Sequence, residues 1–296
     1  SAKNVTRLKT LNMEDCANLS DDMFQAIVKN CKYLSAVHIG SDHHLSWVTD
    51  KTLLHLSRST TALKQFRLAQ NAFVSDVGVS SVCEANRGLV EVGLRNCTEV
   101  GESLLAFAKF CPCLQVLKLV NNKLVKDTSL SALLHNCPNL RELVLIGCSV
   151  TLPTLDSLLL KNLSSLVLGN LPDGTALRLG HFLSRAPALR TLCLREVRSL
   201  TDEDLLALED DLSHLASLSM EFCPRVTSLG LQALLQRCSK LQEFTVFHCN
   251  VTQDVVGCLV QNCAQLRKIS LTWCAGVTDG VLSPFLAPDV LPPLEQ

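Results

Sequence analysis

Apolar residues recur along the chain in the order Leu-x-x-Leu-x-Leu, where Ile, Val, Phe or Met also fill the apolar places. The pattern occurs eleven times at a spacing close to 26 residues, and each occurrence marks one copy of a repeat. The copies begin at Leu8, Leu34, Leu63, Leu89, Leu114, Leu140, Leu163, Leu189, Leu215, Leu241 and Leu266. A period that is kept over the whole length is typical of stacked structural repeats.

Each copy predicts the same local structure. Apolar residues alternate with others in residues 140–148, LRELVLIGC, which predicts a short strand. A turn follows, and then a Ser or Thr that is often followed by Asp, as in Thr201-Asp202. The hydroxyl is a good helix N-cap, and the carboxylate suits the positive end of the helix dipole. The next ~10 residues have helical apolar spacing, so one copy is predicted to be strand, turn, helix, turn.

A strand and a helix of this size bury their apolar faces only against neighbouring copies. Strands pack about 4.8 Å apart and helices about 10 Å apart, so the stack is expected to curve with its strands inside. The sequence therefore predicts an α/β leucine-rich-repeat solenoid, a right-handed βα horseshoe, over residues 1–285. Residues 286–296 are predicted to be a proline-rich C-terminal cap or tail.

Most of the fifteen cysteines fall in two columns of the repeat. The ninth position of a copy holds Cys16, Cys97, Cys148, Cys223, Cys249 and Cys274, with Asn71 and Asn122 in two other copies. A second column, three residues before the first Leu, holds Cys31, Cys111, Cys137, Cys238 and Cys263. Both columns fall at predicted turns, where a small side chain packs and bonds a main-chain group. No Cys-x-x-Cys pair occurs, so we expect these thiols to be structural, with neither a metal site nor a disulfide framework.

The order strand, Cys, Val/Leu-Thr-Asp, helix and Asn-Cys-Pro-x-Leu resembles the cysteine-containing leucine-rich repeats of the F-box/leucine-rich-repeat proteins. Residues 136–151, NCPNLRELVLIGCSVT, and residues 237–252, RCSKLQEFTVFHCNVT, carry the resemblance. It implies a substrate receptor of a cullin-RING ubiquitin ligase. The helical F-box of that family has no counterpart before the first copy, so a ligase adaptor would be held by a segment outside this chain.

Composition and motifs exclude several other classes. The net charge is −1 and there is no Lys/Arg block, so nucleic acid is not an expected partner. Mean hydropathy is +0.25, yet no apolar run reaches the ~18 residues of a membrane span. Residues 1–7 are polar and basic and contain no apolar secretory segment, so an intracellular location, cytoplasmic or nuclear, is expected. Without a nucleophile elbow, zinc-protease motif or P-loop, we expect neither enzyme activity nor a cofactor.

The third, fifth and seventh positions of a copy are predicted to face away from the core. In the first four copies these positions are polar and mixed in charge. In the next copies they are aliphatic, with charged residues around them: Val116, Val120, Val144, Ile146 and Val167, with Arg95, Lys118 and Arg195. An exposed aliphatic patch favours a protein partner on the concave face, although the strand propensity of Val and Ile is an alternative explanation.

The eighth position carries Phe222, His248 and Trp273 in the last three copies, with Phe247 beside them. Aromatic residues make up only 4% of the chain. This column predicts a second partner contact, because aromatic anchors dominate interface energetics; the alternative is that the rings cover the turn of the next copy.

Two copies depart from the pattern. The second has a longer loop, residues 40–50, with His43, His44 and Trp47. We interpret it as a surface loop or a partner contact through Trp47, since a metal site at the histidines lacks a third ligand nearby. In the seventh copy, residues 172–174, Pro-Asp-Gly, predict a tight turn and a shortened convex element.

These patterns predict a protein-interaction module, and the resemblance to F-box/leucine-rich-repeat proteins implies that it is the substrate-recognition part of a ubiquitin ligase. The alternative is a non-catalytic scaffold subunit of a large assembly, such as a ciliary or organellar complex. A sensor that uses the same repeats would need a nucleotide-binding domain outside this sequence.

Overall fold

The computed structural model of the chain describes residues 7–16, 20–41, 46, 48–151, 160–172, 183, 185–208, 212–274 and 276–286. Their contacts form two compact units, Ser1–Val150 and Thr151–Gln296, each described by itself. Three features expected from the sequence lie outside the described residues: the loop side chains His43, His44 and Trp47, the turn at residues 173–174, and the tail beyond residue 286.

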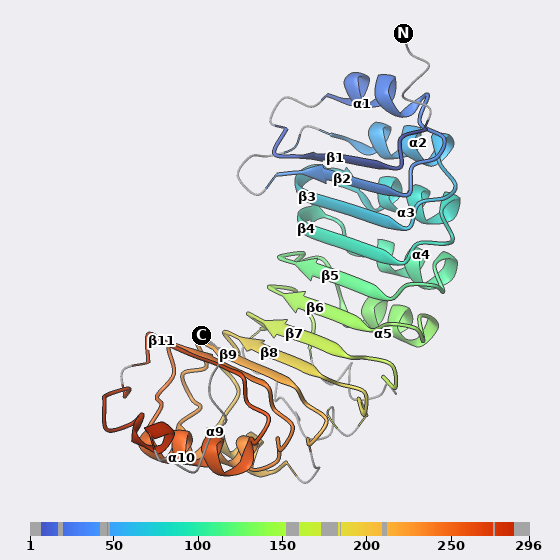
Figure 1. The fold of residues 1–296 in the computed structure, drawn as a ribbon. Helices are drawn as coiled ribbons and strands as arrows, with labels where there is room; N and C mark the ends of the chain where they lie inside the picture. The colour runs from blue at the N-terminus through green and yellow to red at the C-terminus, as the bar shows by residue number, and fades with distance from the viewer. Residues whose placement is uncertain are drawn as a thin grey trace. The chain divides into compact units, whose positions relative to one another are not determined.

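The first unit stacks parallel strands on one side and helices on the other (Figure 1). Strands that follow one another in the chain are neighbours in the sheet. The strands are β1 (Thr10–Glu14), β2 (Ala36–Gly40), β3 (Gln65–Ser75), β4 (Glu91–Glu99), β5 (Val116–Val120) and β6 (Glu142–Ile146). The helices are α1 (Asp21–Val28), α2 (Asp50–Ser59), α3 (Asp76–Ala85), α4 (Ser103–Phe110) and α5 (Asp127–Asn136).

The second unit repeats this arrangement. Its strands are β7 (Ser165–Gly169), β8 (Thr191–Arg195), β9 (Ser217–Glu221), β10 (Glu243–Phe247) and β11 (Lys268–Thr272). Its described helices are α8 (Asp202–Leu206), α9 (Ser228–Leu235), α10 (Gln253–Asn262) and the short 3-10 helix η2 (Ser283–Leu286). All eleven copies therefore contain the strand that the sequence predicts, and the α/β leucine-rich-repeat solenoid is confirmed.

The predicted alternation of buried and outward positions is present in the strands. In β6, Leu143 and Leu145 are completely buried, whereas Val144 and Ile146 are half-buried on the outer face. Burying a leucine completely contributes about 1.5–3 kcal/mol relative to leaving it in water. Most copies bury apolar side chains of their strand, and the described helices add others, such as Leu53, Leu130 and Leu231, so a core runs along each unit.

The ninth-position column bonds the main chain of neighbouring strands, as predicted. The Cys148 thiol donates to the carbonyl of Leu119 on the preceding strand at 3.6 Å. Asn122 takes the same place in its copy, where its amide donates to the carbonyl of Leu94 at 2.7 Å. Burial raises the pKa of Cys148 to about 11. The thiol is therefore protonated at neutral pH and acts as a donor, which fits a structural role.

In four copies the aspartate that begins the helix caps the helix of the following copy. The Asp50 carboxylate accepts hydrogen bonds from the main-chain N–H groups of Ser75 at 2.8 Å and Gly78 at 3.2 Å, and from the Ser75 hydroxyl at 2.6 Å. Asp21, Asp76 and Asp202 make equivalent bonds to the next copy. A side chain at Gly78 would collide with the Asp50 carboxylate. These four aspartates therefore bond each copy to the next, and we call them the aspartate ladder. This role adds to the favourable interaction with the helix dipole that the sequence predicts.

The Asp21 carboxylate is expected to stabilise the second helix in a pH-dependent way. Burial alone raises its pKa, but hydrogen bonds from the Thr49 main chain and from the Thr52 and Thr49 hydroxyls, with the charge of Lys51, lower it overall. A carboxylate whose pKa is depressed by folding stabilises the fold at neutral pH, and this contribution is lost as the pH falls through the folded-state pKa.

Asp21→Asn is predicted to destabilise the N-terminal copies by about 1 kcal/mol at neutral pH, as loss of a helix cap does. Urea unfolding and amide hydrogen exchange at the start of α2 measure this. The difference from wild type should shrink as acid protonates the wild-type carboxylate. Asp22→Asn, at an exposed position of the same helix turn, is the matched control. Equal effects of the two substitutions would contradict the ladder.

Candidate protein-binding surfaces

The strand face of the first unit carries four half-buried aliphatic side chains, Val116, Val120, Val144 and Ile146, which we call the aliphatic patch. They come from β5 and β6, whose register sets Val120 beside Ile146. Because alternate residues of a strand face the same side, the patch forms wherever the third, fifth and seventh positions of adjacent copies are apolar.

Charged residues are interleaved with the aliphatic patch. Lys118 lies between Val116 and Val120 on β5, and its ammonium group pairs with Glu142 on β6 at 2.9 Å. Arg95 on β4 is exposed and sits in register with Val120. The surface can therefore offer a partner both apolar contact and charged groups, and the charged groups would favour one orientation of that partner.

The two sides of β6 are predicted to respond oppositely to a charge. Leu143→Asp should unfold the local copies, because it places an unpaired carboxylate in the core. Val144→Asp with Ile146→Asp should change the melting temperature much less, because both side chains reach solvent on the outer face of the strand. Thermal unfolding followed by circular dichroism measures both. A large loss of stability in the double variant would show that this face is packed.

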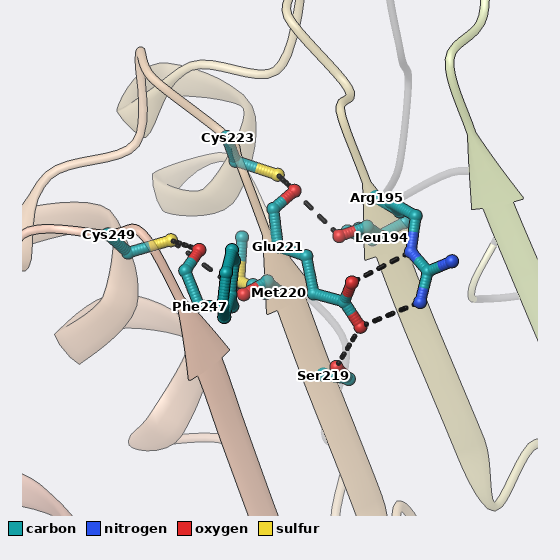
Figure 2. A network of polar contacts seen from close by, with 8 residues as sticks. All are labelled: Leu194, Arg195, Ser219, Met220, Glu221, Cys223, Phe247 and Cys249. Atoms are coloured by element: carbon teal, nitrogen blue, oxygen red, sulfur yellow. Dashed lines mark hydrogen bonds and ion pairs between the residues drawn. The ribbon is translucent and has the colours of Figure 1, made fainter. Parts of the chain in front are cut away.

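The strand face of the second unit is organised around Glu221 (Figure 2). Its carboxylate accepts from Arg195 on β8 through Nε at 2.7 Å and Nη2 at 3.2 Å, and from the Ser219 hydroxyl at 3.4 Å. The same residue's main-chain carbonyl accepts from the Cys223 thiol at 3.6 Å. Glu221 therefore links β8 and β9 to the ninth-position column, and two hydrogen bonds hold the Arg195 guanidinium against it.

Aromatic rings gather where β9 and β10 end. The Phe222 ring meets Phe247 edge-on, with centroids 4.8 Å apart, and stacks on His248 at 5.0 Å. Trp273 follows β11 at the corresponding position and is 77% exposed. The structure thus brings Phe222, Phe247 and His248 into one cluster, with Trp273 at the next place in the column.

The eighth position of the copies has left-handed backbone. Its φ lies between 45° and 62° at Asp15, Gln70, Asn96, Asn121, Gly147, Asn170, Glu196, Phe222, His248 and Trp273. This conformation lets the N–H of Phe222 donate to the Phe247 carbonyl on the next strand at 3.0 Å. Gly and Asn tolerate it readily, whereas a bulky side chain costs about 1–2 kcal/mol. Phe222 and Trp273 therefore occupy positions where smaller residues would be more stable.

Phe222 lines two hollows of the second unit. The larger, of about 710 Å³, lies at the loops that follow β8, β9 and β10 and includes Pro224, Val226 and His248 in its lining. The smaller, of about 420 Å³, lies on the strand face between Arg195, Phe247 and Thr272. We call the first the rim hollow and the second the strand hollow. Neither could be read from the sequence, because each is shaped by three or more copies.

Of the remaining predicted contact residues, the structure describes Val167 and does not describe Trp47. Val167 is half-exposed on β7, in register with Cys193 of β8. Trp47 lies outside the described residues. In the described part of the chain, no three His, Cys, Asp or Glu side chains are grouped so that they could hold a metal ion. No described helix has both the length and the apolar character needed to cross a membrane.

Known structures share this fold at low sequence identity. The yeast protein Rad7, solved in complex with Elc1, is 17% identical with a TM-score of 0.59, covering 90% of this chain and 75% of that one. The internalin InlF of Listeria monocytogenes is 13% identical with a TM-score of 0.54, covering 99% and 88%. No protein-family model matches the sequence. The likeness therefore supports the leucine-rich-repeat class of fold.

Replacing the bulky Trp273, whose backbone is left-handed, with a smaller residue is expected to stabilise the C-terminal copy. Trp273→Asn should raise its stability by up to about 1 kcal/mol, because Asn adopts this backbone at lower cost. Thr272→Asn, at the exposed neighbouring strand position, is the control and should bring no gain. Chemical unfolding of both variants measures this. A fall in stability with Trp273→Asn would contradict this prediction. It would support the alternative that the aromatic rings at the eighth position cover a neighbouring turn.

Proposed function

We propose that this chain is a protein-interaction module that recognises the substrate of a cullin-RING ubiquitin ligase of the F-box type. The target protein binds on the strand face, and the ligase adaptor is held by a segment outside this chain. The module itself supplies no catalytic group.

The aliphatic patch carries this proposal. Val116, Val120, Val144 and Ile146 present apolar surface on a rigid sheet, where the fold itself needs no apolar side chain. An apolar patch with interleaved charges is the usual composition of a specific interface. The Lys118–Glu142 pair lies inside it, so a partner must match both charge and shape.

One further observation supports the ligase assignment, and a second fits a protein-interaction module. The repeat subclass, with Cys at the ninth position and Asn-Cys-Pro at residues 136–138, resembles that of F-box/leucine-rich-repeat proteins. The structurally similar Rad7 was solved in complex with a second protein, Elc1.

The test uses the natural protein that carries this chain, purified from cells with its bound proteins. We expect a cullin adaptor and a target whose ubiquitylation depends on this protein. Val144→Asp with Ile146→Asp should remove the target, keep the adaptor and lengthen the target's lifetime. Val77→Asp, which places the same charge at an exposed apolar residue on α3, is the matched control and should change neither.

Two results would overturn the proposal. Recovery of no cullin adaptor would reject the ligase assignment. If all of the protein were found in one permanent complex, and Val144→Asp with Ile146→Asp left that complex intact, the scaffold function would be favoured instead.

A further inference from the structure

The eighth position of the last four copies holds larger side chains than its left-handed backbone favours. The four copies before them have residues that suit this conformation, Asn96, Asn121, Gly147 and Asn170. From β8 onwards the position holds Glu196, Phe222, His248 and Trp273. One carboxylate and three rings therefore follow one another at the ends of these strands. Strained residues of this kind concentrate at functional sites, and a binding role would explain their cost in stability.

Glu196 places a carboxylate at the strand hollow. Its main-chain N–H donates to the Glu221 carbonyl at 2.7 Å, just as the N–H of Phe222 donates to Phe247, so Glu196 and Phe222 occupy equivalent places in successive copies. Among the described residues, none makes a hydrogen bond or ion pair with the Glu196 carboxylate. Arg195, which also lines the hollow, donates to the Glu221 carboxylate through Nε and Nη2 (Figure 2). Since that pair is balanced, Glu196 leaves the lining of the strand hollow with a net negative charge.

The Phe222 ring stands beside this carboxylate in the column. Its described ring contacts, Phe247 edge-on and His248 stacked, both come from the following copy, whereas Glu196 occupies the same position in the preceding copy. Phe222 remains 40% exposed, and it lines the strand hollow together with Glu196 and Phe247. The face of an aromatic ring attracts a cation through the ring quadrupole, and a neighbouring carboxylate adds to that attraction. The strand hollow therefore combines two features that favour a positively charged ligand.

The charges around the strand hollow favour the same ligand. Arg198 lines the rim hollow but not the strand hollow, and Arg225 lines neither. Residues 195–208 and 212–230 together contain five acidic and three basic side chains, so the surroundings are negative overall. The hydrogen bonds that Asp202 accepts at the start of α8 stabilise its negative charge and do not remove it. A surplus of negative charge raises the local concentration of cationic groups.

We infer that the strand hollow of the second unit binds a basic side chain, arginine or lysine, of a partner protein. The cationic group lies against the Phe222 ring and pairs with the Glu196 carboxylate. The aliphatic stem of the basic side chain packs against Phe247, as the stems of Lys and Arg do on apolar surfaces. The Thr245 and Thr272 side chains also line the hollow and offer hydroxyl groups to the partner. A volume of about 420 Å³ accommodates one long side chain with part of its main chain.

This inference rests on the proposed function only for the identity of the protein that carries the basic residue. The probe is a displayed library of random peptides selected on the purified chain, followed by fluorescence anisotropy with the selected peptides. We expect enrichment of Arg or Lys at one peptide position. Replacing that residue with Gln in the peptide should weaken binding about tenfold, because the positive charge is lost. Binding should also weaken with rising salt, since the hollow is open to solvent.

Variants of the protein separate the carboxylate, the ring and the general field. Glu196→Gln keeps the size of the side chain, removes its charge and should weaken binding about tenfold. Glu196→Lys should abolish binding of the basic peptides. Phe222→Leu keeps an apolar side chain, removes the ring and should weaken binding by about threefold to tenfold. Glu203→Gln removes the same charge at an exposed position of α8 that lines neither hollow, and this matched control should change the affinity by less than about twofold.

Selection of peptides without Arg or Lys, or an empty selection, would overturn the inference. Equal losses with Glu196→Gln and Glu203→Gln, or full affinity with Phe222→Leu, would overturn it as well. The proposed function fails separately, through absence of a cullin adaptor or through retention of the target in the aliphatic-patch variant. A target that the aliphatic-patch variant loses and the Glu196→Lys variant keeps at full affinity would reject the contact at the strand hollow and keep the proposed function.

Discussion

Each copy of this repeat is completed by its neighbours, and the rest of the structure depends on that constraint. The Asp50 carboxylate caps the helix of the next copy, and the Cys148 thiol bonds a carbonyl of the previous strand. Main-chain groups at the turns, which would be costly to bury unpaired, are thereby satisfied between copies. Short strands and helices that would be unstable alone become rigid when they are stacked.

This rigidity leaves the outward strand positions free for other roles. Val144 and Ile146 can vary without disturbing Leu143 and Leu145, because the two sets face opposite sides of β6. The eighth position is less free, since its left-handed backbone penalises bulky side chains. Aromatic residues at the eighth position lower the stability of the fold. Their presence is therefore stronger evidence of a binding role than a valine on the outer face of a strand.

The sequence predicts some features of the candidate surfaces and not others. The apolar alternation in β5 and β6 was enough to place Val116, Val120, Val144 and Ile146 on one face. The aromatic column at Phe222, His248 and Trp273 was visible as a spacing, but the stacking of Phe222 on His248 and the two hollows that Phe222 lines were not. Ring geometry and hollow shape depend on loops from three copies, which no local pattern describes.

The sequence by itself determined the repeat, its strands and helices, and the buried face of each, because these follow from apolar periodicity within one copy. Only the tertiary structure decided which groups meet across copies: Lys118 with Glu142, Arg195 with Glu221, and each capping aspartate with the next helix. It also decided the left-handed turn, because the N–H at that position turns toward a carbonyl on the following strand. Such contacts join residues about one repeat apart, and their partners are set by stacking and register, which local propensity does not encode.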